Sequence, residues 1–206
     1  MHSENVFRGL FALSAVAMTC IRVYYQMRDR RGREHVTIRE KGLSLVAGGL
    51  AALITIVFGV GYIFFPGAFS WAYVQYPDGL RWLGALFLAI GITLLGVSHH
   101  HLGKSFHSLV VTKEGQIFVD SGPYRWVRHP IYTAFFINYI GGGLLAGSWV
   151  LTFIPALLYG VLVALRVENE ERAMVEQFGQ VYADYMQRTG RFLPSIRAKA
   201  SSKGIR

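Results

Sequence analysis

The stretch Ser121-Gly-Pro-Tyr-Arg-Trp-Val-Arg-His-Pro-Ile-Tyr132 concentrates polar and aromatic residues inside a mostly apolar chain. Gly122-Pro123 predicts a turn. Pro130 suits the first turn of a helix, because its φ is fixed near the helical value and no N–H is needed there. An apolar run follows, so the stretch is predicted to lie at the entrance of a membrane helix. Its simplest interpretation is an interfacial loop, with arginines at lipid headgroups and aromatic rings at the membrane surface.

The composition favours a membrane protein over a soluble one. The 206 residues are 52% hydrophobic and only 16% charged, whereas soluble domains usually contain about a quarter charged residues. The charges form blocks between long apolar runs. The net charge of +9 does not indicate nucleic acid, because the basic residues flank apolar runs and no nucleic-acid-binding motif is present. The single cysteine, Cys20, lies in an apolar run, where a packing role is expected.

The apolar runs predict five transmembrane helices, at residues 6–25, 43–65, 80–101, 131–146 and 149–165. The first three make up residues 1–101 and enclose a basic loop at 26–42. The second run is rich in Gly and Ala, which lets a neighbouring helix approach closely. Almost no loop separates the last two runs, so residues 131–165 are predicted to form an antiparallel helical hairpin with Gly147 at the bend.

Basic residues predict the orientation in the membrane. Five spans put the termini on opposite sides. Of the 21 Lys and Arg, only Arg8 and Arg81 fall on the side of the N-terminus. Since basic residues collect on the cytoplasmic side, the N-terminus is expected outside and the C-terminus in the cytoplasm, in a bacterial inner membrane or the endoplasmic reticulum. The stretch 121–132 would then face the cytoplasm, where nucleotide-derived cofactors are found.

A C-terminal amphipathic helix is predicted after the last span, either at the cytoplasmic interface or continuing from that span. Gly190 and Pro194 are expected to end it. Residues 195–206 are polar and basic and are predicted to be disordered. The fold class is therefore an all-α integral membrane protein with about five transmembrane helices and a C-terminal amphipathic cytoplasmic helix. The large residues that define the helix recur at helical spacing: Met174, Phe178, Val181, Tyr182 and Tyr185.

Arg166 and Glu170 lie at the end of the last apolar run, at the depth where the stretch 121–132 begins. They are four residues apart and so share one face of a helix. One interpretation is an ion pair at the membrane boundary. The other is a pocket in which the arginine holds an anion and the glutamate holds a cation, since an ionisable residue near a membrane span is a functional hypothesis by default.

Two motifs then appear together. The chain has Gly-Pro-Tyr-x-x-x-Arg-His-Pro-x-Tyr, the helical hairpin, and Glu-Glu-x-x-Met-x-x-x-Phe-Gly-x-x-Tyr-x-x-Tyr followed by Arg-Phe-Leu-Pro. This pattern resembles the isoprenylcysteine carboxyl methyltransferase family, whose module phospholipid methyltransferases share. The resemblance covers residues 102–194, the expected methyltransferase module. One departure is Ala134, which stands where the family often has Gly and would narrow the pocket by a methyl group.

The resemblance implies an integral membrane methyltransferase that uses S-adenosyl-L-methionine. It would methylate a carboxylate or other nucleophile of a lipophilic, membrane-embedded acceptor at the cytoplasmic face. The resemblance assigns Arg166 to the acceptor carboxylate, as the catalytic residue. For an amine acceptor, Glu168 or Glu171 is a candidate proton acceptor. The residues implied to contact the cofactor are Gln116, Ile117, Phe118, Val119, Tyr124, His129, Pro130, Ile131, Tyr132 and Glu170.

Two other functions stay open. Sterol reductases end in a similar Arg-His-Pro-x-Tyr module but bind NADPH there; their tail usually carries Arg-Asp-Glu and Lys-Tyr-Gly, where this chain has Glu-Glu and Phe-Gly. A non-enzymatic membrane protein would use the stretch only as a lipid anchor. His99, His100 and His101 do not predict a metal site, because successive helical side chains point ~100° apart. With His107 they are expected to form an interfacial end to the third span.

Overall fold

The computed structural model describes residues 2–30, 42–102 and 118–195, and within these ranges the chain is mostly helical and contains no strand. The α-helices are α1 (His2–Arg30), α2 (Gly42–Phe64), α3 (Asp78–Leu102), α4 (Pro130–Ala146), α5 (Trp149–Phe178) and α6 (Gln180–Arg188). Two short 3₁₀ helices, η1 (Ser70–Ala72) and η3 (Gly122–Arg125), precede α3 and α4. The predicted all-α fold class is confirmed.

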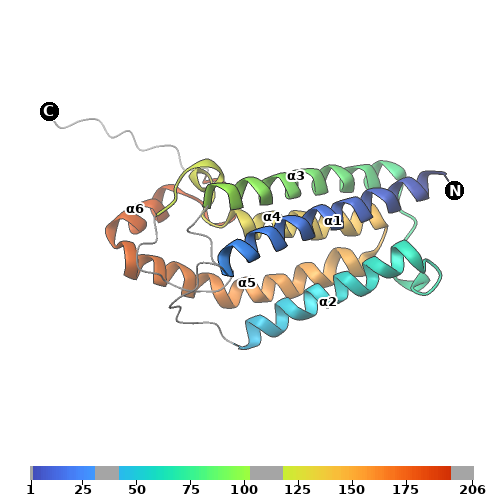
Figure 1. The fold of residues 1–206 in the computed structure, drawn as a ribbon, viewed down its shortest axis with the longest axis horizontal. Helices are drawn as coiled ribbons and strands as arrows, with labels where there is room; N and C mark the ends of the chain where they lie inside the picture. The colour runs from blue at the N-terminus through green and yellow to red at the C-terminus, as the bar shows by residue number, and fades with distance from the viewer. Residues whose placement is uncertain (1, 31–41, 103–117, 196–206) are drawn as a thin grey trace.

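Five helices, α1 to α5, run along the long axis of an elongated bundle (Figure 1). The start of α1 lies at one end of the bundle, and α6 lies at the other. α4 packs between α3 and α5, while α2 packs mainly on α5. In the described part of the chain, α1, α2, α3 and α5 are long and apolar enough to cross a membrane. α4 is apolar but has only 17 residues, which span about 25 Å. The chain is an integral membrane protein.

Glycines set the closest helix contacts. A Cβ at Gly84 of α3 would lie 2.5 Å from the backbone nitrogen of Leu145 in α4. A Cβ at Gly141 of α4 would lie 2.9 Å from the carbonyl oxygen of Gly84. The backbones of α3 and α4 therefore meet with no side chain between them. The expected close approach to α2 is also seen, because a Cβ at Gly48 would lie 2.4 Å from the Leu162 side chain of α5.

The predicted hairpin of α4 and α5 is present, with Gly147 at the bend. Gly147 caps α4 in the left-handed conformation (φ 65°), which favours glycine. The Ser148 hydroxyl accepts a hydrogen bond from the Leu151 N–H, capping α5, and donates one to the Ala72 carbonyl. The Val74 N–H donates to the Gly147 carbonyl at 2.7 Å. These bonds hold the connector before α3 against the turn of the hairpin.

The C-terminal helices differ in detail from the prediction. Of the two predicted arrangements, the structure has the second, because the C-terminal helix continues from the last predicted span and α5 runs as one helix to Phe178. The predicted amphipathic helix is split at Gly179, whose φ of 57° and ψ of −131° lie outside the helical region. α6 begins after this break and ends at Arg188. Cys20 is exposed on α1, so the packing role expected for it was wrong. Residues 196–206 lie outside the described residues.

The histidines at the end of α3 point to different neighbours. His99 is buried and stacks on Tyr25 of α1, with ring centroids 4.7 Å apart. His101 lies beside the start of η3, where its Nδ1 is 3.4 Å from the Ser121 hydroxyl. Within the described ranges, no group of three His, Cys, Asp or Glu side chains is placed to hold a metal ion. His107 lies outside them.

Candidate functional site

The site is built where the stretch 121–132 meets the segment after α6. η3 leads into a short extended segment in which Val127 forms a parallel bridge with Gly190. The Arg128 N–H donates to the Gly190 carbonyl at 2.8 Å, and the His129 N–H donates to the Arg191 carbonyl at 3.0 Å. Pro130 then begins α4, as predicted. Backbone pairing thus fixes the side chains of the stretch against a segment that is distant in the sequence.

Glu171 is the most enclosed acid of this site. Its side chain is 5% exposed, and both of its carboxylate oxygens accept hydrogen bonds. Arg128 Nε donates to Oε1 at 2.9 Å, and His129 Nε2 lies 3.1 Å from the same oxygen. Arg191 Nη2 donates to Oε2 at 2.5 Å. A carboxylate held this way compensates buried cations, which points to a positioning role for Glu171 rather than the proton-accepting role considered for an amine acceptor.

Glu170, the acid next to Glu171, lies where three other predicted site residues meet. The Tyr132 hydroxyl donates to Glu170 Oε1 at 2.5 Å, and Arg166 Nε lies 3.5 Å from that oxygen. His129 Nδ1 is 3.7 Å from Glu170 Oε2. The His129 and Tyr132 rings stack with a centroid distance of 5.5 Å. The structure therefore brings Arg166, Glu170, His129 and Tyr132 together, and the Glu170 side chain keeps 22% of its surface exposed.

The hydroxyl group of Tyr124 lies near Glu170. Its hydroxyl is buried and makes no hydrogen bond to any described residue. Burial raises the pKa of Tyr124, and the nearby Glu170 carboxylate raises it further, so the hydroxyl stays protonated. The Tyr185 hydroxyl donates to the Tyr124 carbonyl at 2.6 Å, which fixes η3 to α6. A buried hydroxyl without a partner is a ready contact for a polar group of a ligand.

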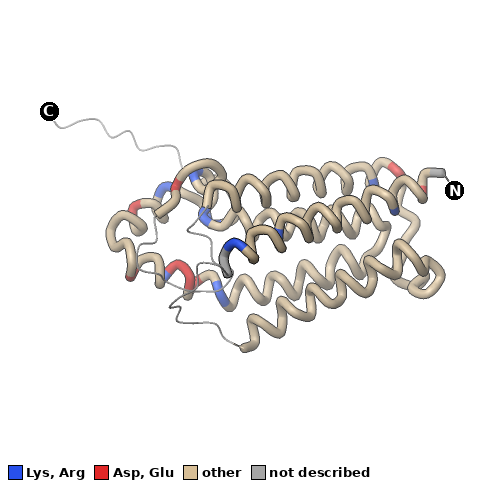
Figure 2. The backbone as a smooth tube through the Cα atoms, in the orientation of Figure 1, with Lys and Arg blue, Asp and Glu red and all other residues tan. Residues whose placement is uncertain are grey.

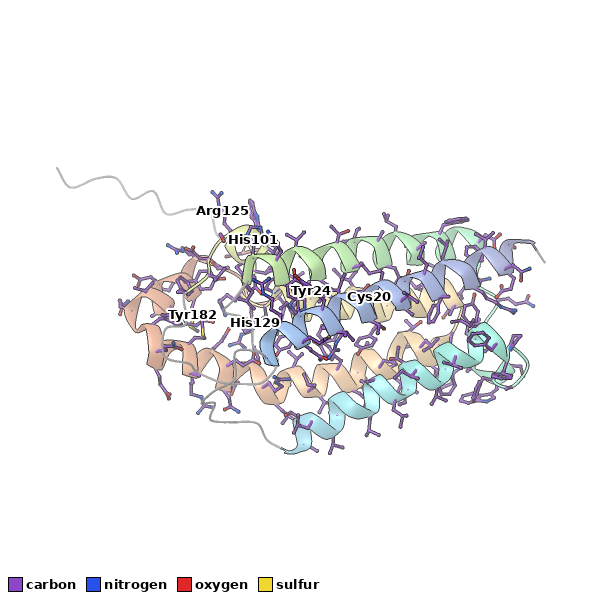
Figure 3. The ribbon with its side chains drawn as sticks, in the orientation of Figure 1. Cys20, Tyr24, His101, Arg125, His129 and Tyr182 are labelled. Carbon is purple, nitrogen blue, oxygen red and sulfur yellow. The ribbon has the colours of Figure 1, made fainter. Side chains whose placement is uncertain are left out.

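The strip before the turn is described only from residue 118 onward, so Gln116 and Ile117 lie outside the described residues. Phe118 packs its ring against Tyr185, Phe178 and Tyr182, at centroid distances of 5.1, 5.7 and 5.9 Å. Val119 is partly buried beside it. This strip therefore lines the same end of the bundle as α6. Figure 3 shows His129 and Tyr182 together at that end.

Pro130 and Ile131 join the site to the helical core. Pro130 is fully buried at the start of α4, and Ile131 packs against the apolar cluster formed by α2, α3, α4 and α5. Thr133, one helical turn after His129, donates to the Phe192 carbonyl at 2.8 Å. The first turn of α4 is thereby anchored to the segment after α6, which keeps His129 and Tyr132 in place.

Some residues of the site were not assigned from the sequence. Arg128 and Arg191 stand within the quoted motifs, but their shared partner Glu171 becomes apparent only in the fold. Tyr159 was also missed. Its ring packs on Phe135, Tyr139 and Tyr132, which places an aromatic cluster next to the polar site. The helical spacing could have identified Tyr159, because it precedes Arg166 by two helical turns and therefore lies on the same face of the helix.

These features define a class: all-α integral membrane proteins with a polar site at one end of the helical bundle. A model of the isoprenylcysteine carboxyl methyltransferase family matches residues 82–176. The eukaryotic intramembrane Ras methyltransferase, isoprenylcysteine carboxyl methyltransferase, has a solved structure that is similar, with a TM-score of 0.54 and 25% identity, covering 78% of this chain and 55% of that one.

Two curated relatives each match more than half of the chain. The protein-S-isoprenylcysteine O-methyltransferase of Schizosaccharomyces pombe is 32% identical over 112 residues, covering 53% of this chain and 48% of the relative. The cobalt-zinc-cadmium resistance protein CzcN of Cupriavidus metallidurans is 30% identical over 120 residues, covering 58% and 54%. The chain thus spans about half the length of these relatives. The match to the isoprenylcysteine carboxyl methyltransferase family model over residues 82–176, just under half of the chain, agrees with the resemblance drawn from the motifs.

Proposed function

We propose that the chain is an S-adenosyl-L-methionine-dependent methyltransferase that modifies a lipophilic acceptor in the membrane. The observation that carries the proposal is the grouping of Glu170, Tyr132, His129 and Arg166 at the junction of the two family motifs. Named methyltransferases among the relatives support it. The alternative, an NADPH-dependent reductase, has no support from these relatives and is an outcome of the test below.

The side chains of the site fit this cofactor. S-adenosyl-L-methionine supplies a methyl group on a cationic sulfur, together with an amino group, a carboxylate and an adenosine. Glu170 offers a carboxylate for an amino group or a ribose hydroxyl. Tyr124 offers a buried hydroxyl without a described partner. The stacked His129 and Tyr132 rings and the ring of Phe118 provide aromatic surface for a base or a cation.

Methyl transfer to a carboxylate needs alignment more than acid–base chemistry. Tyr132 donates to Glu170 and so fixes the orientation of the cofactor-binding carboxylate. Arg166, one helical turn away, would hold the acceptor's carboxylate by a charge-assisted hydrogen bond. The aromatic cluster around Tyr159 excludes water from the side of the bundle core. Alignment of the acceptor oxygen with the methyl group then accounts for the rate.

We expect the detergent-solubilised full chain to bind S-adenosyl-L-methionine and its demethylated product, and to bind NADPH at least about tenfold more weakly. Glu170 should favour a cationic ligand, whereas the phosphates of NADPH would meet a carboxylate there. Isothermal titration calorimetry with the three ligands measures this. Glu168→Ala is the matched control, because Glu168 is exposed on the same helix and should leave all three affinities unchanged. Binding of NADPH alone would establish the reductase alternative.

We also propose that the site faces the cytoplasm. Figure 2 shows basic residues gathered toward the end of the bundle that carries α6, in keeping with the charge bias of the sequence. A reporter enzyme that is active only in the cytoplasm, fused after Arg206, is expected to be active. The same reporter fused before Met1 is the control and is expected to be inactive. Activity at the N-terminal fusion with none at the C-terminal fusion would reverse the orientation.

A further inference from the structure

The end of the bundle opposite the candidate site contains a second polar cavity. It has a volume of about 390 Å³ and lies between the start of α1, the end of α2, the connector before α3 and the turn of the α4–α5 hairpin. This volume falls in the range of small-molecule sites, about 300–1,000 Å³. The polar residues that line it include Glu4, Arg8, Tyr62, Tyr73, Gln75 and Arg81. The methyl-transfer site uses none of them.

Arg81 forms the structural part of this cavity. Its side chain is 11% exposed, and its guanidinium lies 4.0 Å from the centroid of the Phe7 ring. Nε donates to the Leu145 carbonyl at 2.9 Å, and Nη2 donates to the Tyr62 hydroxyl at 2.7 Å. Nη1 donates to Glu4 Oε2 at 2.6 Å. Arg81 thus ties α1, α2, α3 and α4 together, and each of its guanidinium nitrogens is already used.

Arg8 is the less engaged cation. It lies one helical turn after Glu4, and its Nε is 3.5 Å from Glu4 Oε1. That Nε is buried and makes no hydrogen bond to any described residue, while 27% of the side chain stays exposed. Among the described residues that line the cavity, Glu4 is the one acid, and it is shared between Arg8 and Arg81. These three side chains together carry one positive charge more than they carry negative charge.

The surroundings place this cavity at a membrane surface. Trp71 and Trp149 are exposed beside it, and their rings meet at a centroid distance of 5.9 Å. Exposed tryptophans at the ends of apolar helices are typical of the headgroup layer. The cavity opens toward the aqueous side, because three residues of its wall are exposed: Pro66, Ser70 and Gln75. A ligand entering here would come from the headgroup layer or from water.

We propose that this cavity binds the phosphate of an anionic phospholipid headgroup, on the membrane face opposite the methyl-transfer site. Arg8 supplies the guanidinium donors, whose planar geometry matches phosphate oxygens. Arg81 fixes the wall of the cavity through its hydrogen bonds and adds a second positive charge. Glu4 offsets one of the two charges, so that one phosphate neutralises the remaining charge. Free phosphate shares this chemistry, and the lipid is favoured because the cavity adjoins the tryptophans of the headgroup layer.

The test measures lipid binding to the full chain in detergent by native mass spectrometry. The ligands are dioctanoyl phosphatidylglycerol, dioctanoyl phosphatidylcholine and inorganic phosphate. We expect phosphatidylglycerol to bind at least about tenfold more tightly than phosphatidylcholine, and Arg8→Gln to weaken it by at least about tenfold, the effect of one lost charge-assisted contact. Arg28→Gln is the matched control, because Arg28 is exposed near the other end of α1. It should leave the affinity unchanged.

A second variant should change the affinity for phosphatidylglycerol in the opposite direction. Glu4→Gln removes the carboxylate that offsets the two arginines, so phosphatidylglycerol should bind more tightly although the chain loses a partner of Arg81. Equal weakening by Arg8→Gln and Arg28→Gln would overturn the proposal in favour of non-specific surface charge. No weakening by Arg8→Gln would also overturn it. Binding of inorganic phosphate that depends on Arg8, without any preference for phosphatidylglycerol, would overturn the lipid as the ligand.

Discussion

Glu171→Ala is expected to destabilise the protein by about 3–5 kcal/mol, the cost of removing one partner from a buried ion pair. The carboxylate is 5% exposed and holds Arg128, whose side chain is 9% exposed, together with His129 and Arg191. Without Glu171, the hydrogen-bond acceptors left to the Arg128 side chain among the described residues are the carbonyls of Met186 and Thr189, which do not compensate its buried charge. The melting temperature in detergent should fall, and cofactor affinity should fall with it.

Two comparisons make this prediction specific. Glu168→Ala removes the same charge from an exposed position of the same helix and should leave the melting temperature unchanged. Arg128→Leu combined with Glu171→Leu should be less destabilising than the sum of the two single changes, because the buried charge of Arg128 is removed together with that of Glu171. Equal melting temperatures for Glu171→Ala and Glu168→Ala would show that the Glu171 contacts contribute nothing to stability.

Glu170→Ala and Arg166→Ala are expected to separate cofactor binding from acceptor handling. Loss of the Glu170 carboxylate should weaken S-adenosyl-L-methionine binding by about 1.5–3 kcal/mol, the value of a hydrogen bond to a charged group. This corresponds to roughly 10- to 150-fold in the dissociation constant. Arg166→Ala should leave that constant nearly unchanged but raise KM for the acceptor or lower kcat, because the acceptor's carboxylate loses its partner. Titration calorimetry and a radiolabelled methyl-transfer assay measure the two effects.

Arg166→Lys tests the geometry of the arginine. It should restore activity only in part, since an ammonium cannot replace a planar two-donor group. The competing interpretation is that Arg166 and Glu170, 3.5 Å apart, serve only as an ion pair at the end of the span. In that case both alanine variants would lower the melting temperature and leave equal cofactor affinities. The methyl-transfer proposal would then lose its two central residues.

Hydropathy and backbone chemistry predict most of this fold. Five apolar runs place the five helices of the bundle, Pro130 marks the start of α4, and Gly147 marks the turn of the hairpin. Each depends on a local property, either the burial of apolar side chains in lipid or a fixed backbone conformation. The break at Gly179 was not predicted, because the residues on both sides of it favour one continuous helix.

The site was predicted only in part, because local motifs can be read from the sequence but contacts between distant segments cannot. The motifs point to His129, Tyr132, Arg166 and Glu170, and the fold brings these four together. Their roles toward a cofactor and an acceptor stay predictions. The sequence could not reveal that Glu171 holds Arg128 and Arg191, since those arginines belong to segments that meet only through the pairing of Val127 with Gly190. The link between Glu4 and Arg81 is equally non-local, joining the first helix to the third.

The pairing of the stretch 121–132 with the segment after α6 also sets an order of events in biosynthesis. The N–H groups of Arg128 and His129 find their acceptors on Gly190 and Arg191. Those acceptors are synthesised only after the residues of all five long helices. The N–H groups of Arg128 and His129 therefore cannot make these two bonds until translation has passed residue 191. The backbone pairing that fixes the candidate site is a late step for this reason, whereas contacts among α1 to α4 need only residues made earlier.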